Sequence, residues 1–159
     1  MYFECINCNT CVDANISISV CPDCCYPLTI RQDGTSTLLR DSQIVTLGEG
    51  GSKVIQLSKL AGLVGVSKVY AKLENSNPTG SFKDRGSATM IGAIKSAGIR
   101  NIVEDSSGNA GASVAAYSAS AGIQAHIFVP ENASKAKIDQ ISVYGATVYR
   151  VPGHRDNSE

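Results

Sequence analysis

The chain has 159 residues, which is enough for one ordinary domain and a small additional module. Its 14 basic and 14 acidic residues give a net charge of zero, so the composition does not favour a polyanionic partner. The first residues lack the basic and apolar regions of a signal peptide. No run approaches the roughly 18 consecutive apolar residues of a membrane helix. We therefore expect a cytoplasmic protein that has no membrane or nucleic-acid partner.

All six cysteines fall within residues 5–25. Four of them form two Cys-x-x-Cys pairs separated by twelve residues: Cys5 and Cys8, then Cys21 and Cys24. Two such pairs on separate turns can bring four thiolates to the corners of a tetrahedron, as a structural zinc ion requires. We predict a zinc ribbon over residues 1–30, the alternative being reduced or redox-active thiols without a metal. Cys11 and Cys25 belong to neither pair, and Cys25 could replace Cys24 as a ligand.

Many zinc ribbons bind nucleic acid, but the composition of this segment argues against that role. Residues 1–30 contain three acidic residues and no Lys or Arg. Four thiolates around one zinc ion add further negative charge, whereas phosphate binding needs positive charge. We expect a structural role, in which the ribbon extends the edge of the larger domain.

After the ribbon, residues 31–45 are polar and are expected to form a linker, and residues 46–159 alternate between strand and helix patterns. The expected strands are 68–74, 101–105, 125–130 and 146–152, and the expected helices are 83–97, 109–121 and 134–145. This alternation predicts an α/β fold: an open, mostly parallel sheet with helices on both faces. Ligands of such sheets bind in the loops that lead from strand ends into helices.

One of these loops carries a lysine within the sequence NPTGSFKDRG, residues 77–86. Ser81 and Asp84 resemble an N-terminal capping box, which places Lys83 in the first turn of the following helix. A cation is disfavoured there because the helix dipole is positive at this end. A lysine shifted toward the neutral amine attacks carbonyl carbons and forms Schiff bases. Lys83 is therefore a candidate catalytic residue, the alternative being an ordinary surface charge.

A second loop, EDSSGNAGAS over residues 104–113, joins a strand to an Ala-rich helix. Backbone N–H groups at a helix start bind carboxylate or phosphate, and Ser106, Ser107 and Asn109 add short polar side chains. The alternative is a plain capped helix. Because both loops leave strands at one edge of a single sheet, we expect Asn109 to lie close to Lys83.

Together, SFKDRG, SSGNAG and the four-cysteine ribbon resemble the threonine synthase family of fold type II pyridoxal-phosphate enzymes. The resemblance covers essentially the whole chain and includes LGEGGSKVIQL, residues 47–57. It implies that Lys83 forms the Schiff base with pyridoxal phosphate and later moves protons at the substrate's α and β carbons. It implies that Asn109 bonds the cofactor's phenolic oxygen and that Phe82 walls the ring. By the same resemblance, the substrate carboxylate is held by Ser106, Ser107 and the backbone amides of Gly108 to Ala110.

The resemblance implies a lyase of threonine biosynthesis, one branch of amino-acid biosynthesis, that converts O-phosphohomoserine to threonine and phosphate. Its cofactors would be pyridoxal 5'-phosphate and a structural zinc ion, and its full-length form would be a homo-oligomer. Cysteate synthase and amino-acid dehydratases are related alternatives, although dehydratases resemble the rest of the chain without the ribbon. A different class of function is a non-catalytic, truncated paralogue that binds zinc.

Three departures from the family pattern lie near the expected substrate pocket and leave the exact substrate open. SKV at 52–54 replaces Thr-Pro-Leu, Ala110 replaces a common Thr, and Glu104 with Asp105 replaces small or apolar residues. Neither the glycine-rich loop for the cofactor phosphate nor a partner for the pyridine nitrogen is found. We therefore expect the ribbon and the smaller domain of a two-domain enzyme, with the second large domain absent and no activity from this chain alone.

Overall fold

The computed structural model describes residues 2–13, 18, 20–31 and 45–153. The described part contains three small sheets and four α-helices. Within it, every helix is too short or too polar to cross a membrane.

The cysteine-rich segment folds into a three-stranded antiparallel sheet. Its strands are β1 (Tyr2–Cys5), β2 (Cys11–Asp13) and β3 (Leu28–Arg31), in the order β2-β1-β3. The linker expected over residues 31–45 lies mostly outside the described residues. Its first and last residues are not linker-like in the structure. Arg31 is the last residue of β3, and Val45 is buried in the core of the α/β part.

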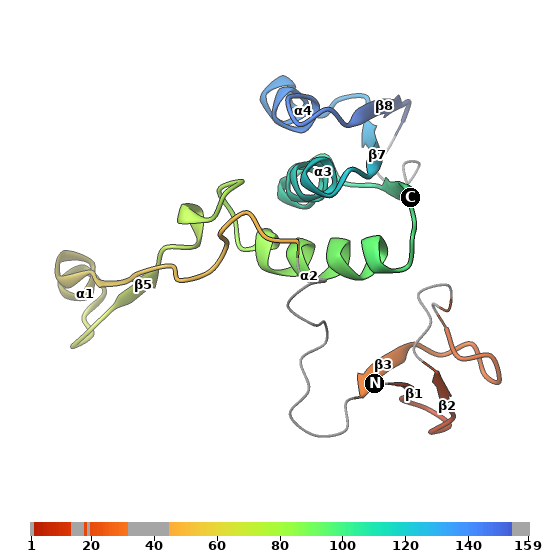
Figure 1. Ribbon diagram of the computed structural model, residues 1–159. Helices are drawn as coiled ribbons and strands as arrows, with labels where there is room; N and C mark the ends of the chain where they lie inside the picture. The colour runs from red at the N-terminus through yellow and green to blue at the C-terminus, as the bar shows by residue number, and fades with distance from the viewer. Residues whose placement is uncertain (1, 14–17, 19, 32–44, 154–159) are drawn as a thin grey trace.

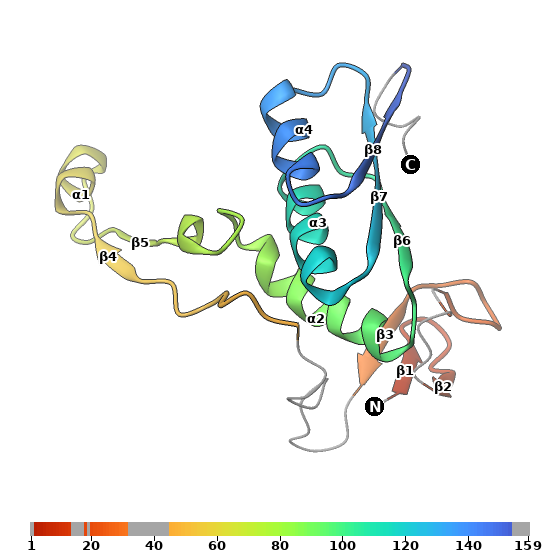
Figure 2. The same ribbon diagram turned by 45° about the horizontal axis from the view of Figure 1, so that its top comes forward.

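A hairpin with a short helix follows, and it projects from the rest of the α/β part in both views (Figures 1 and 2). It consists of β4 (Val54–Gln56), α1 (Ser58–Val64), β5 (Tyr70–Lys72) and a 3-10 turn, Glu74–Ser76. The strand expected over 68–74 is therefore shorter and pairs antiparallel with β4 instead of joining the parallel sheet. Its neighbour β4 is close in sequence, and bonds from Leu57 to Val69 and from Leu73 to Lys53 extend their pairing.

The parallel sheet confirms the α/β fold. Strands β6 (Asn101–Glu104), β7 (Gln124–Pro130) and β8 (Thr147–Val151) are parallel and lie in sequence order. The helices α2 (Lys83–Ser96), α3 (Asn109–Ala121) and α4 (Lys135–Ser142) agree with the expected ones to within a few residues.

Helices were expected on both faces of this sheet, but in the described residues α3 and α4 lie on the same face, and α2 packs against α3 (Figure 2). The physical reason is the strand order. Right-handed crossovers that step in one direction along a parallel sheet place their helices on one side, and a helix on the other side requires the direction to reverse.

Helix α3 lies at the centre of the core and packs against α2, α4 and β7. Small side chains such as Ala112 and Ala115 allow this close packing, and both are buried. Tyr117 is the largest side chain that is fully buried. The starts of α2 and α4 both meet the first turns of α3, through the bond between Asp84 and Ser113 and the bond between Lys137 and Asn109.

Candidate functional site

Lys83 is the first residue of α2, as the sequence predicts. Its side chain is exposed, and Nζ lies 5.1 Å from the centre of the Phe82 ring, which is also exposed. The expected capping box is wrong, because the Asp84 carboxylate does not accept the backbone N–H of Ser81 and bonds Thr79 and Ser113 instead. Ser81 Oγ accepts the backbone N–H of Lys83 at 3.3 Å. The amine is thus presented outward from a helix start, beside an aromatic ring.

Asp84 is fully buried and has other partners, which explains why the capping box does not form. Its carboxylate accepts the backbone N–H of Thr79 at 2.8 Å and the Thr79 hydroxyl. It also accepts the hydroxyl of Ser113, in α3, at 2.6 Å. A buried carboxylate needs such donors. Asp84 therefore joins α3 to the loop that leads into α2 and carries Lys83, residues 77–83, which is called the lysine loop below.

Asn109 is the first residue of α3, also as predicted. The residues around it, Ser106, Ser107, Gly108 and Ala110, are half-buried at the mouth of the helix. Ser106 Oγ accepts the backbone N–H of Gly108 at 3.3 Å. A Cβ at Gly111 would lie 2.0 Å from the Ser106 carbonyl oxygen, so the loop lies directly against the helix at a place where only glycine fits.

The two loops meet through the bond between Asp84 and Ser113. Asp84 follows Lys83 directly, and Ser113 lies about one helical turn beyond Asn109, so the first turns of α2 and α3 are neighbours. Burial and the neighbouring Asp105 raise the pKa of Glu104 at the end of β6, and the positive charge of Lys83 partly offsets the rise. The roles of Lys83, Phe82 and Asn109 toward a ligand stay predictions.

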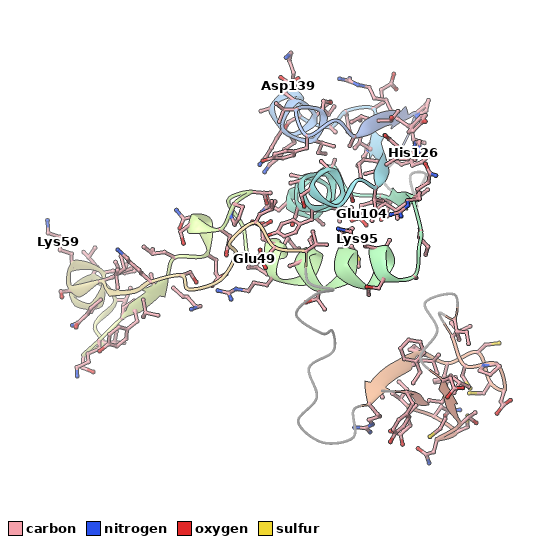
Figure 3. All side chains as sticks on the ribbon, in the orientation of Figure 1. Glu49, Lys59, Lys95, Glu104, His126 and Asp139 are labelled. Atoms are coloured by element: carbon pink, nitrogen blue, oxygen red, sulfur yellow. The ribbon has the colours of Figure 1, made fainter. Side chains whose placement is uncertain are left out.

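Sequence reasoning missed a set of polar contacts that support the lysine loop. Glu49, labelled in Figure 3, accepts the hydroxyl of the buried Tyr117 at 2.6 Å. Glu74 accepts bonds from Arg85 and Ser52, and these bonds lower the pKa of Glu74 to about 2. These bonds connect the 46–52 segment and the turn after β5 to α2 and α3. The partners are 11 to 68 residues apart in sequence, which leaves no local signal.

The four paired cysteines form one cluster in which all sulfur atoms lie within 4.8 Å of one another. The separations are 3.4 Å for Cys5 and Cys24, 3.6 Å for Cys8 and Cys21, and 3.4 Å for Cys8 and Cys24. A zinc ion with bonds of about 2.3 Å to four tetrahedral thiolates separates the sulfurs by about 3.8 Å. All four thiols are free, so the donor set and its spacing fit zinc.

Cys25, the neighbour of Cys24, lies outside this group of four in the structure. Asn9 and Cys25 each follow the second cysteine of a pair and have positive φ angles of 58° and 59°. They are the non-glycine residues with this conformation among those described. Each donates its backbone N–H to the carbonyl of the first cysteine of its pair. Cys25 therefore closes a turn and is exposed, and like Cys11 it stands outside the cluster.

The α/β part is similar to a known protein family. The family described as "Pyridoxal-phosphate dependent enzyme" matches residues 45–159. Threonine synthase of Halalkalibacterium halodurans is 40% identical over 119 residues, which are 74% of this chain and 33% of that protein. Threonine synthase of Methanocaldococcus jannaschii is 38% identical over 119 residues, 74% of this chain and 29% of that protein. The chain thus spans about a third of the length of these curated relatives.

Solved structures give a consistent result. Maize serine racemase is similar with a TM-score of 0.61 and 30% identity, over 67% of this chain and 32% of the racemase. A pyridoxal 5'-phosphate-dependent aspartate racemase is similar with a TM-score of 0.61 and 31% identity, over 67% of this chain and 34% of that chain. In both cases the similarity covers about two thirds of this chain.

Proposed function

The chain belongs to the pyridoxal-phosphate dependent enzyme family, and from this premise we propose that Lys83 is the lysine that attaches the cofactor. The observation that carries the proposal is the hydrogen bond between Asp84 and Ser113. It places the helix start that presents an amine beside the helix start that presents Asn109. A cofactor held between the two loops would be in reach of both.

The residues present fit one edge of pyridoxal phosphate. The cofactor has an aldehyde, a phenolic oxygen and an aromatic ring. Within the described residues, no hydrogen bond or ion pair engages Lys83 Nζ, so the amine is available to an aldehyde. Phe82 offers a ring face and Asn109 offers a side-chain amide at the neighbouring helix start. When bound, the cofactor supplies an electron sink for substrate carbanions.

Residues of the chain would transfer protons and bind the substrate carboxylate. Lys83 would accept and return protons at the α and β carbons of an amino-acid substrate. The backbone amides from Gly108 to Ala110, with Ser106 and Ser107, would hold its carboxylate, because N–H groups at a helix start bind anions. Similarity to threonine synthases supports O-phosphohomoserine as the substrate, with water as co-substrate and threonine and phosphate as products.

Titration with pyridoxal phosphate tests the cofactor proposal. The chain should bind weakly, because a neutral hydrogen bond such as that from Asn109 contributes only about 1 kcal/mol. Binding should still produce the visible absorbance band of a lysine-bound cofactor. Lys83→Ala should abolish the band, whereas Lys95→Ala, near the other end of α2, should keep it. An unchanged band in Lys83→Ala would overturn the assignment.

Phosphate release tests the reaction separately. We expect no turnover of O-phosphohomoserine by the 159-residue chain, because an exposed site does not exclude water from the cofactor. A full-length relative should release phosphate and lose this activity when the matching lysine is replaced. Release by the chain itself, lost in Lys83→Ala, would show that the chain suffices for catalysis.

We also propose that the cysteine cluster binds one structural zinc ion, within a ribbon over residues 1–30 that precedes a linker over 31–45 and the α/β domain over 46–159. Protein purified without added zinc should contain about one zinc per chain. Cys21→Ser should lose the metal because this buried ligand is one of four, whereas Cys25→Ser should keep it. No zinc together with six reactive thiols would contradict the proposal.

A further inference from the structure

We propose that Lys137, in α4, is a positioning residue that sets the orientation of the Asn109 side-chain amide. This inference rests on the proposed function, in which Asn109 faces the cofactor. Lys137 Nζ donates to Asn109 Oδ1 at 2.8 Å, across 28 residues of sequence. The motifs SFKDRG and SSGNAG, on which the sequence resemblance was based, do not include this lysine.

The chemistry of the two groups makes their contact directional. A side-chain amide has an oxygen that accepts and a nitrogen that donates, and the two ends have nearly the same shape. An ammonium group only donates. Lys137 therefore fixes the oxygen of Asn109 toward α4 and leaves the NH₂ group to donate elsewhere. Donation is what a phenolate oxygen of a bound cofactor requires.

The packing of α4 explains why Lys137 reaches Asn109. Lys137 and Ile141 are four residues apart and share one face of the helix. Ile141 is fully buried, and its Cδ1 would lie 3.2 Å from a Cβ at Gly111, in the first turn of α3. On the same helix, Gln140 donates to the carbonyl oxygen of Thr79 at 3.1 Å. Helix α4 thus contacts both loops of the candidate site.

A neighbouring lysine shows that this contact is not a general property of the helix. Lys135 is exposed and forms an ion pair with Asp139 at 2.6 Å. Lys137 is half-buried and forms no ion pair within the described residues. A cation in the first turn of a helix is disfavoured by the dipole, so the Asn109 oxygen provides a compensating partner. Lys135 therefore serves as a matched control.

The first experiment observes Asn109 without any cofactor. The side-chain amide resonances of Asn109 are assigned by NMR in the wild-type chain, Lys137→Met, Lys137→Arg and Lys135→Met. We expect a shift in Lys137→Met, partial or full return in Lys137→Arg, which restores a donor, and no change in Lys135→Met. Identical Asn109 resonances in Lys137→Met and wild type would overturn the proposal. Thermal unfolding of each variant separates a lost fold from a lost contact.

The second experiment measures affinity for pyridoxal phosphate and the absorbance maximum of the bound cofactor. Loss of one oriented hydrogen bond predicts about fivefold weaker binding and a displaced maximum in Lys137→Met, with Lys135→Met unchanged. Equal affinity and an equal maximum in the two variants would overturn the proposal even if the resonances shift. A wild-type chain whose binding does not depend on Lys83 would instead refute the proposed function, and the NMR result would then decide alone whether Lys137 orients Asn109.

Discussion

The two loops of the candidate site are held in place by different means. The loop before α2 is held by a buried carboxylate, because Asp84 accepts bonds from Thr79 in the loop and from Ser113 in α3. The loop before α3 is held by close backbone packing against Gly111 in its own helix and by the contact of Lys137 with Asn109 at the surface. The buried bonds of Asp84 and the backbone packing at Gly111 contribute to stability, and the contact of Lys137 contributes to the orientation of Asn109. Substitution of Asp84 or Gly111 should therefore lower the stability of the fold, whereas substitution of Lys137 should change the orientation of Asn109 without a comparable loss.

Among the substitutions considered, Asp84→Ala should cause the largest loss in the free energy of unfolding. This change leaves the Thr79 N–H and the Thr79 hydroxyl without their acceptor in a buried region, and it leaves the Ser113 hydroxyl with Ser87 as its remaining acceptor. Each unsatisfied buried group costs about 1–3 kcal/mol, so we expect a loss of about 3 kcal/mol or more in the free energy of unfolding. Chemical denaturation measures it.

Asp139→Ala provides the control for that experiment, since Asp139 forms an exposed pair with Lys135. Exposed pairs of this kind contribute about 0.5 kcal/mol or less. Similar losses in the two variants would mean that Asp84 does not fix the lysine loop, and the contrast between the loops would disappear.

Gly111→Ala should have the next largest effect. The new Cβ would meet the Ser106 carbonyl oxygen at 2.0 Å, and backbone atoms cannot move away easily. Overpacking of this kind costs about 1–3 kcal/mol. Gly86→Ala, in α2, meets nothing within 4 Å and should stabilise the protein by about 0.5–1 kcal/mol because alanine favours a helix. Thermal unfolding of both variants should give changes of opposite sign, and a stabilised Gly111→Ala would refute the packing of this loop.

Glu104→Gln should cause the smallest change in the free energy of unfolding, and this change should depend on pH. Burial and Asp105 raise the folded-state pKa of Glu104 above its unfolded value. Wild-type protein therefore loses stability as pH rises through the folded pKa, whereas the Gln variant does not. The variant should be more stable than wild type at neutral pH, and this gain should vanish below the unfolded pKa.

Denaturation at several pH values tests the Glu104 prediction, with Glu131→Gln, an exposed carboxylate after β7, as the control. A gain that persists unchanged into the acidic range would show that ionisation of Glu104 is not its cause.

Several elements follow directly from the sequence. Helix α3 begins and ends as predicted because Asn109 follows a glycine and Gly122 adopts φ 71° after the last turn. The positions of Lys83 and the four clustered cysteines also agree with their local patterns.

The remaining elements depend on contacts that no local pattern reveals. Helix α1 spans only 7 residues and buries only Ala61, so its apolar residues cover a window too short to establish a helical period. Asp84 is recruited by Ser113, 29 residues away, and this tertiary contact overrides the capping box. Cys25 closes a turn at a positive φ angle, which cysteine rarely adopts.

Reductive trapping of the cofactor is the most direct test of the central claim that Lys83 attaches pyridoxal phosphate between the two loops. The chain is incubated with pyridoxal phosphate, reduced with borohydride and digested, and the modified peptide is identified by mass spectrometry. The account predicts that the label lies on Lys83, and that Asn109→Ala lowers its yield. A label mainly on Lys72, Lys95 or another lysine would contradict it.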